Sequence, residues 1–118
     1  MEEKFNIDFL DEAIDFMNSL ELKAKRKVYY NLRKSQLVND PELFKKLSEN
    51  IWEFRTLCEK KQYRLFAFWD KTDKNETLVL ATHGIIKKTQ KTPKNEIKKA
   101  EEIRKIYFEQ KNKKNENK

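Results

Sequence analysis

Two arginines in successive apolar segments are the residues whose types and spacing first suggest chemistry. Arg55 and Arg64 both lie in segments that predict strands, and the second segment is apolar on both sides except for Arg64. A charged side chain in such a strand is costly to bury unless it meets an anion. That anion is either a carboxylate, Glu53 or Glu59, or a phosphate, which planar guanidinium groups bind through paired hydrogen bonds. Phosphate binding requires both arginines on one face of the sheet.

A second candidate is the stretch HGIIKKTQKTPKNE, residues 83–96, which contains the only histidine and the only glycine of the chain. His83 either takes part in proton transfer or is a buried histidine that bonds to a backbone group. Gly84 predicts a turn that other residues make less readily. The lysines that follow either contact a polyanion or belong to a solvated turn, and they are Lys87, Lys88 and Lys91.

Composition and charge limit the possible functions. The chain has 118 residues, enough for one domain with one modest core. Its net charge is +7, and the excess lies in residues 84–118, as expected either for a polyanion-binding surface or for a solubilising tail. The single cysteine and single histidine predict neither a disulfide nor a zinc site, and we expect no cofactor. With no signal peptide and no apolar span, we expect a cytoplasmic protein without a membrane partner.

Helical patterns occupy the first and last parts of the chain. Residues 11–20 and 21–37 predict two helices joined as an antiparallel hairpin. Pro41 predicts a short helical turn within residues 39–47. Thr92 and Pro93 predict the N-cap and first position of a last helix. We expect a single domain over residues 1–110, followed by a basic, disordered tail over residues 111–118.

The middle of the chain has the composition of strands. Residues 51–58, 63–69 and 77–83 are rich in β-branched and aromatic types and are separated by polar stretches, which predicts an antiparallel meander. Residues 5–9 alternate as in a short strand or a segment that leads into a helix. Together these elements predict an α+β fold.

The ordered segments IWEFR, YRLFAFW, LVLATHGIIKKTQKTPKNEIKKA and EEIRKIYFEQ resemble the HigB-type branch of the RelE/ParE toxin superfamily. This branch includes phage-derived killer proteins of bacterial addiction modules. The resemblance covers roughly residues 3–108, and HGIIKKTQKTPKNEI is its most specific part. It implies a RelE-like α+β fold: an N-terminal helical hairpin packed on a small, twisted, mostly antiparallel sheet, with a C-terminal helix.

The resemblance also implies an activity. Most HigB-type toxins are metal-independent endoribonucleases that cleave messenger RNA on the ribosome, and a cognate antitoxin of helix-turn-helix type neutralises them. By position, Arg55 and Arg64 would stabilise charge in the transition state and Glu53 would act as a base, with His83 as a further candidate for a proton role. Lys87, Lys88 or Lys91 would bind RNA or transfer protons, with Lys87 and Lys88 as the catalytic candidates. Lys94 and Lys98 would bind RNA, as would Lys91.

An ordinary lysine is a poor base at neutral pH, because its pKa is near 10.4. Burial or neighbouring cations would have to lower that pKa. Three other functions stay open: a ParE-like inhibitor of gyrase, a noncatalytic nucleic-acid-binding or regulatory domain, and a partner-binding protein whose interface is the helical hairpin.

Overall fold

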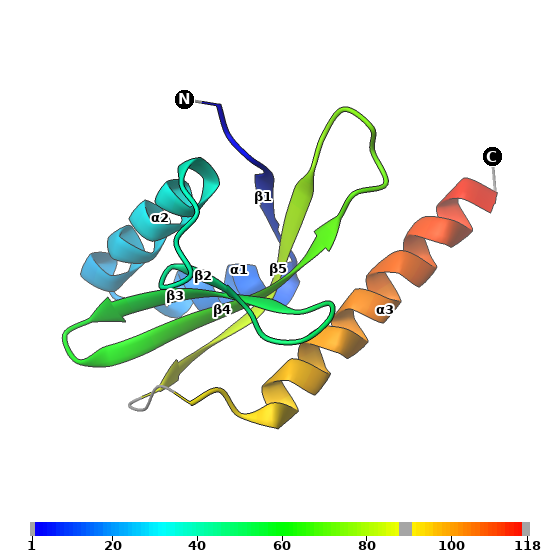
Figure 1. The fold of residues 1–118 in the computed structure, drawn as a ribbon. Coiled ribbons are helices and arrows are strands. Elements are labelled where there is room, and N and C mark those ends of the chain that lie inside the picture. Colours follow the sequence, from blue (N-terminus) through cyan, green and yellow to red (C-terminus); the bar gives the residue numbers. More distant parts are fainter. Residues whose placement is uncertain (1, 88–90, 117–118) are drawn as a thin grey trace.

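A five-stranded sheet forms the centre of the structure, a computed structural model that describes residues 2–87 and 91–116 (Figure 1). The strand order is β1-β5-β4-β3-β2. The strands are β1 (Asn6–Phe9), β2 (Phe44–Lys46), β3 (Trp52–Cys58), β4 (Lys61–Asp70) and β5 (Leu78–Lys87). Only β1 and β5 pair in parallel, and the other pairs are antiparallel. The predicted α+β class and the predicted meander, formed by β3, β4 and β5, are confirmed.

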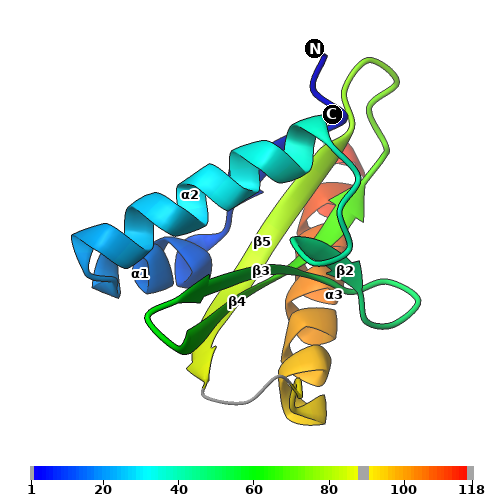
Figure 2. The ribbon, with the colours of Figure 1, turned by 60° about the vertical axis from the view of Figure 1, so that its left-hand side comes forward.

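Helices cover both faces of the sheet (Figures 1 and 2). The hairpin of α1 (Asp11–Ser19) and α2 (Leu22–Leu37) packs its apolar side on one face, and α3 (Lys94–Glu116) packs on the other. The central strand β4 is apolar on both sides because it contributes Leu65 to the first core and Phe66 to the second. Because both faces of β4 are buried, the charged side chain of Arg64 in this strand is unusual.

The segment after α2 differs from its prediction. Residues 41–43 form a turn and β2 follows, where Pro41 had predicted a short helix. The ring of Phe44 stacks on that of Phe54 with centroids 4.2 Å apart, and the Arg55 backbone N–H donates to the carbonyl of Leu43 at 2.8 Å. Aromatic burial and strand pairing at the sheet edge thus outweigh the weak preference of proline for a helix start.

The last strand is longer than predicted. β5 continues past His83 to Lys87, so Gly84 lies inside a strand and not at a turn. The backbone of Gly84 does not have a positive φ angle. A Cβ atom at Gly84 would lie only 2.3 Å from Cδ2 of Phe16, in α1. The residue is therefore glycine because the helix packs directly against the strand, and the predicted turn was wrong.

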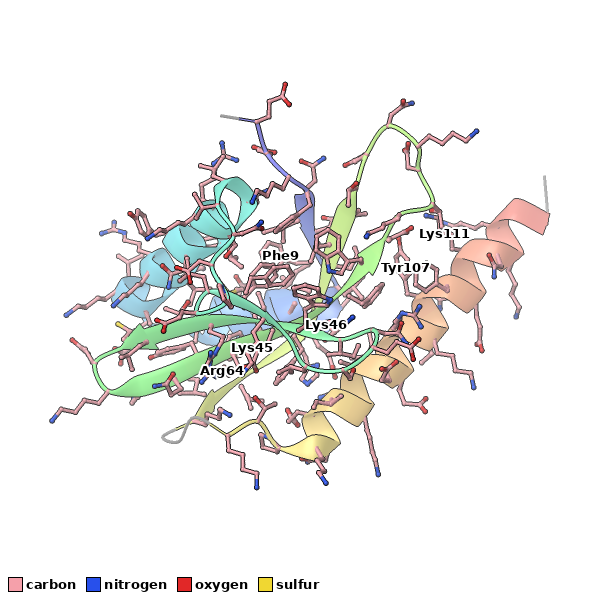
Figure 3. All side chains as sticks on the ribbon, viewed as in Figure 1. Phe9, Lys45, Lys46, Arg64, Tyr107 and Lys111 are labelled. Carbon is pink, nitrogen blue, oxygen red and sulfur yellow. The ribbon has the colours of Figure 1, made fainter. Side chains whose placement is uncertain are left out.

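Both ends of α3 also differ from the predictions. The helix begins at Lys94, and the Thr92 hydroxyl bonds to the side chain of Glu53, so Thr92 is not its N-cap. At the other end α3 continues to Glu116, beyond the predicted tail boundary at residue 111. Lys111 Nζ donates to Asp70 Oδ2 at 2.7 Å, and the Tyr107 hydroxyl donates to the same oxygen at 2.6 Å (Figure 3). These bonds to a buried carboxylate order the last turns of the helix.

Candidate functional site

Arg55 and Arg64 lie directly opposite each other on neighbouring strands. The register of β3 and β4 pairs the two residues, which places both side chains on the face that α3 covers. The condition that phosphate binding sets, both arginines on one face of the sheet, is therefore met. Glu53 shares this face, and its Oε1 lies 3.5 Å from Nε of Arg55 and 3.7 Å from Nη1 of Arg64. The carboxylate is thus one anion shared by two guanidinium groups, as the structural alternative required.

A third cation joins this group from β5. The Thr92 hydroxyl donates to Glu53 Oε2 at 2.9 Å, and Nζ of Lys87 donates to the Thr92 hydroxyl at 3.4 Å. We call these residues the cationic cluster: Glu53, Arg55, Arg64, Lys87 and Thr92. Three cationic side chains surround one carboxylate, so the cluster retains an excess of positive charge. Because one carboxylate does not neutralise three cations, the cluster can attract a further anion.

An irregularity in the sheet brings Lys87 to the cluster. Side chains alternate between faces along a regular strand. Leu80 and Ile85 are five positions apart, yet both pack in the core beneath α3. The register of β4 and β5 shifts between Leu65 and Ala67, so one extra residue of β5 is accommodated there. Lys87, two positions after Ile85, therefore lies on the same face as the arginines.

Burial shapes the electrostatics of the cluster. The Arg64 side chain is 1% exposed and that of Arg55 is 18% exposed. Burial lowers the pKa of Arg64, an effect that Glu53 opposes and Arg55 reinforces. Burial also lowers the pKa of Lys87, and the positive charge of Arg64 lowers it further. The pKa of Lys87 is therefore lowered, which is the direction that proton transfer by a lysine requires.

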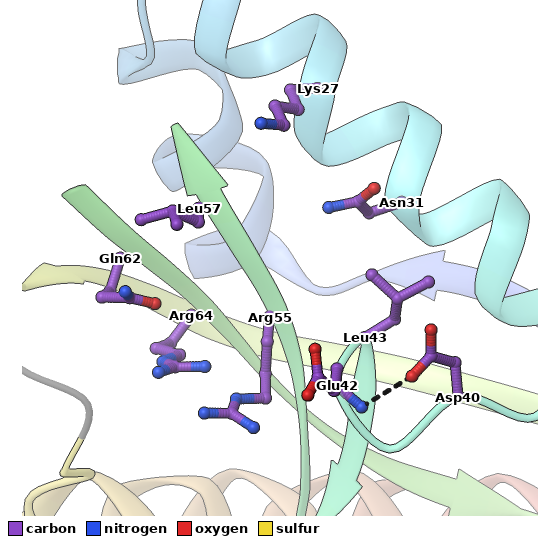
Figure 4. A pocket seen from close by; sticks show the side chains of 9 residues that line it. All are labelled: Lys27, Asn31, Asp40, Glu42, Leu43, Arg55, Leu57, Gln62 and Arg64. Carbon is purple, nitrogen blue, oxygen red and sulfur yellow. Dashed lines mark hydrogen bonds between the residues drawn. The ribbon is translucent and has the colours of Figure 1, made fainter. Parts of the chain in front are cut away.

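A cavity of about 330 Å³ gives access to the two arginines (Figure 4). It lies between α2, the turn before β2 and the free part of the β3 edge, and both guanidinium groups point toward the same side of the sheet. Its lining combines charges of both signs with amide groups, and consists of Lys27, Asn31, Asp40, Glu42, Leu43, Arg55, Leu57, Gln62 and Arg64. A space of this size and polarity suits a polar ligand such as part of a nucleotide.

Residues 15–105 match the model of the family described as phage-derived protein Gp49-like (DUF891). The chain belongs to this family. Gp49-like proteins are commonly associated with the toxins of toxin–antitoxin systems. The match includes every residue of the cationic cluster. No curated protein matches the chain.

In this Gp49-like chain, His83 lies apart from the cationic cluster. Its Nδ1 lies 2.9 Å from the Thr82 hydroxyl, its Nε2 lies 3.3 Å from Glu96 Oε2, and its ring stacks on Phe66. Burial lowers the pKa of His83, although the carboxylate of Glu96 opposes this effect. Burial therefore favours the neutral imidazole. Within the described residues the two ring nitrogens face side chains, not the backbone partner that the sequence suggested as an alternative.

The other predicted lysines have different positions. Lys91, Lys94 and Lys98 are exposed, around the start of α3. Lys88 lies outside the described residues. Among residues 2–87 and 91–116, no group of acids, histidine or cysteine could hold a metal ion, and no helix is long and apolar enough to cross a membrane.

Sequence reasoning missed two features of this chain. Thr92 was taken for a helix cap, because nothing in the sequence connects it with Glu53, which is 39 positions away. The helix α2 contains six lysines and arginines and no acidic residue. The charge balance of residues 1–83 concealed this, because acids elsewhere in the chain compensate for it. A count of charge by element would have revealed it.

Proposed function

We propose that this Gp49-like protein is the toxin of a type II toxin–antitoxin system and cleaves messenger RNA on the ribosome. The observation that carries the proposal is the convergence of Arg55, Arg64 and Lys87, from three adjacent strands, around Glu53. The association of the family with toxins supports it. A neutralising antitoxin, of helix-turn-helix type, is part of the same proposal.

The proposed reaction uses a nucleophile that belongs to the RNA. The ribose 2′-oxygen forms a bond to the adjacent phosphorus as the bond from phosphorus to the 5′-oxygen breaks, which yields a 2′,3′-cyclic phosphate and a 5′-hydroxyl. Arg55 and Arg64 stabilise the charge that accumulates on the nonbridging oxygens. Lys87, with its lowered pKa, takes part in proton transfer. The proton leaves the 2′-hydroxyl, and the 5′-oxygen gains one.

Glu53 has a positioning role in this scheme. One of its oxygens faces both arginines and the other accepts the Thr92 hydroxyl, so it fixes the guanidinium groups beneath the phosphate. To act as the base that the sequence suggested, Glu53 would have to give up its contacts with the arginines and Thr92. Residues Lys91, Lys94 and Lys98 are exposed and hold the RNA strand outside the cluster.

The best test alters Arg55, because its side chain is partly exposed, whereas removal of the buried Arg64 would leave Glu53 with less compensation and endanger folding. Arg55→Gln keeps a polar side chain of similar length. Removal of one group that stabilises transition-state charge typically lowers a rate by about 10²–10³-fold. We expect Arg55→Gln to abolish growth arrest and in vivo messenger-RNA cleavage, mapped by sequencing 5′ ends.

The control is Arg104→Gln, which removes one arginine charge from α3, where Arg104 lies over the ring of Phe108 and outside the cluster. It should cleave like the unaltered protein. Circular dichroism and urea titration establish that each variant is folded. Undiminished cleavage by Arg55→Gln refutes the site, whereas intact RNA together with a DNA-damage response in the unaltered protein supports gyrase inhibition instead.

A further inference from the structure

The exposed side of α2 carries a row of positive charge. Five cationic residues of α2 follow the spacing of three or four positions that places side chains on one side of a helix. They are Lys23, Arg26, Lys27, Arg33 and Lys34. All of them are exposed. We call these five residues the α2 stripe. The opposite side of the helix contributes Ala24, Val28 and Leu32 to the core.

Lys34 lies in the last turn of α2, where the helix dipole favours a cation, but the charges at the start of the α2 stripe do not favour the helix that bears them. Lys23 lies in the first turn, where the helix dipole favours acids, and no acid is present there. Lys23 and Lys27 are also like charges four positions apart. A helix with some acidic residues at these positions would fold more readily. The arrangement therefore points to a bound polyanion and not to the stability of the fold.

The surrounding acids compensate for only part of this charge. Lys23 pairs with Glu59, and Arg33 pairs with Glu3, in two exposed contacts that contribute little. Within residues 2–87 and 91–116, no ion pair involves Arg26, Lys27 or Lys34. A row of cations that are only partly compensated is the electrostatic footprint of a surface that binds nucleic-acid phosphates.

The α2 stripe and the cationic cluster lie on different faces of the sheet. α2 packs on the face opposite the one that α3 and the cluster share, although Lys27 of the stripe lines one cavity with Arg55 and Arg64 of the cluster. Figure 2 shows α2 and α3 on opposite sides of the sheet. A messenger-RNA strand with its phosphate in the cluster would leave most of the stripe uncovered. The stripe therefore suits a second polyanion.

We propose that the α2 stripe docks on the phosphate backbone of a ribosomal-RNA duplex and holds the toxin on the ribosome. This inference rests on the proposed function. From Lys23 to Lys34 the helix rises about 16 Å, at roughly 1.5 Å per residue. A straight, rigid row of this length fits the regular backbone of a duplex. An acidic protein segment is the less suitable occupant, because lysine, which supplies three of the five cations, is depleted in protein interfaces.

The test measures binding of the full chain to purified 70S ribosomes by sedimentation, over a series of potassium chloride concentrations. The stripe variant is Arg26→Gln with Lys34→Gln, which leaves Lys27 unaltered because it lines the cavity of the arginines. Each lost phosphate contact reduces the slope of log affinity against log salt by about one. We expect weaker binding at every salt concentration and a slope reduced by about two.

Two further proteins complete the experiment. A charge-matched control, Lys74→Gln with Lys105→Gln, removes two exposed lysines from other elements and should bind with the original slope. Arg55→Gln should bind ribosomes normally even though it does not cleave. Failure of the proposed function is therefore seen as undiminished cleavage by Arg55→Gln, or as absence of cleavage by the unaltered protein. Failure of this inference is seen as unchanged ribosome binding by the stripe variant.

Three results would overturn the proposal. The first is ribosome binding by the stripe variant with unaltered affinity and slope. The second is an equal loss in the charge-matched control, which would indicate net charge alone. The third is normal ribosome binding by the stripe variant combined with escape from a coexpressed antitoxin, which would assign the stripe to a protein partner.

Discussion

The close packing of Gly84 against Phe16 allows a precise prediction about stability. In Gly84→Ala the new Cβ would lie 2.3–2.5 Å from three carbons of the Phe16 ring. Nonbonded carbons prefer about 3.5–4.0 Å, so the ring or the helix must move by more than about 1 Å. Overpacking of this kind typically costs about 1–3 kcal/mol. The smaller conformational freedom of the unfolded alanine chain offsets about 0.4–1 kcal/mol of that.

The expected net loss is about 1–2 kcal/mol in the free energy of unfolding. In a urea titration followed by circular dichroism, with a slope of about 2 kcal/mol per molar, the midpoint should fall by roughly 0.5–1 M. The decisive measurement is a double-mutant cycle with Phe16→Leu. If the ring is the obstacle, Gly84→Ala should cost much less in that background, with a coupling energy of about 1 kcal/mol or more.

The matched control replaces Phe16→Leu by Phe9→Leu, which alters the same apolar core but not the ring that faces Gly84. Here the two substitutions should be additive within about 0.5 kcal/mol. Additive costs with Phe16→Leu as well would refute the explanation by packing. The glycine would then have to be explained by its backbone, although its φ angle is not positive.

Three other predictions concern ionisable side chains. Burial alone would raise the pKa of Asp70, but hydrogen bonds from Lys111, Tyr107 and Thr72 outweigh it and lower that pKa. Asp70→Asn should therefore reduce the urea midpoint at pH 7. This reduction should shrink as the pH falls below about 3.9, because the carboxylate of the unfolded chain then becomes protonated. Because burial lowers the pKa of His83, the unfolded chain binds more protons below about pH 6.5, and urea midpoints should fall with pH more steeply for the unaltered protein than for His83→Gln. A slope that is identical for both proteins would contradict the burial of a neutral His83. If Lys87 transfers protons, the cleavage rate of purified toxin–ribosome complexes should titrate below the ordinary lysine pKa, and Lys87→Arg should remove that titration while RNA binding persists.

Much of the fold was predictable because it depends on local patterns. The apolar spacing of residues 11–37 predicted α1 and α2, and the three apolar runs predicted β3, β4 and β5. The isolated arginine in β4 indicated that an anion lies beside it, and the carboxylate of Glu53 does so. The segment around Pro41 was predicted wrongly because the stacking of Phe44 on Phe54, a contact between strands, decides its conformation.

By itself, the sequence determined the fold class, the candidate residues and the basic character of the chain, because composition and periodicity are properties of short segments. Only the tertiary structure decided which candidates lie together. The register of β3 and β4 placed Arg55 opposite Arg64, and the irregularity of β5 turned Lys87 toward them while His83 faced other partners. Cross-strand register and bulges result from packing between distant segments, and a shift of one position moves every side chain to the other face.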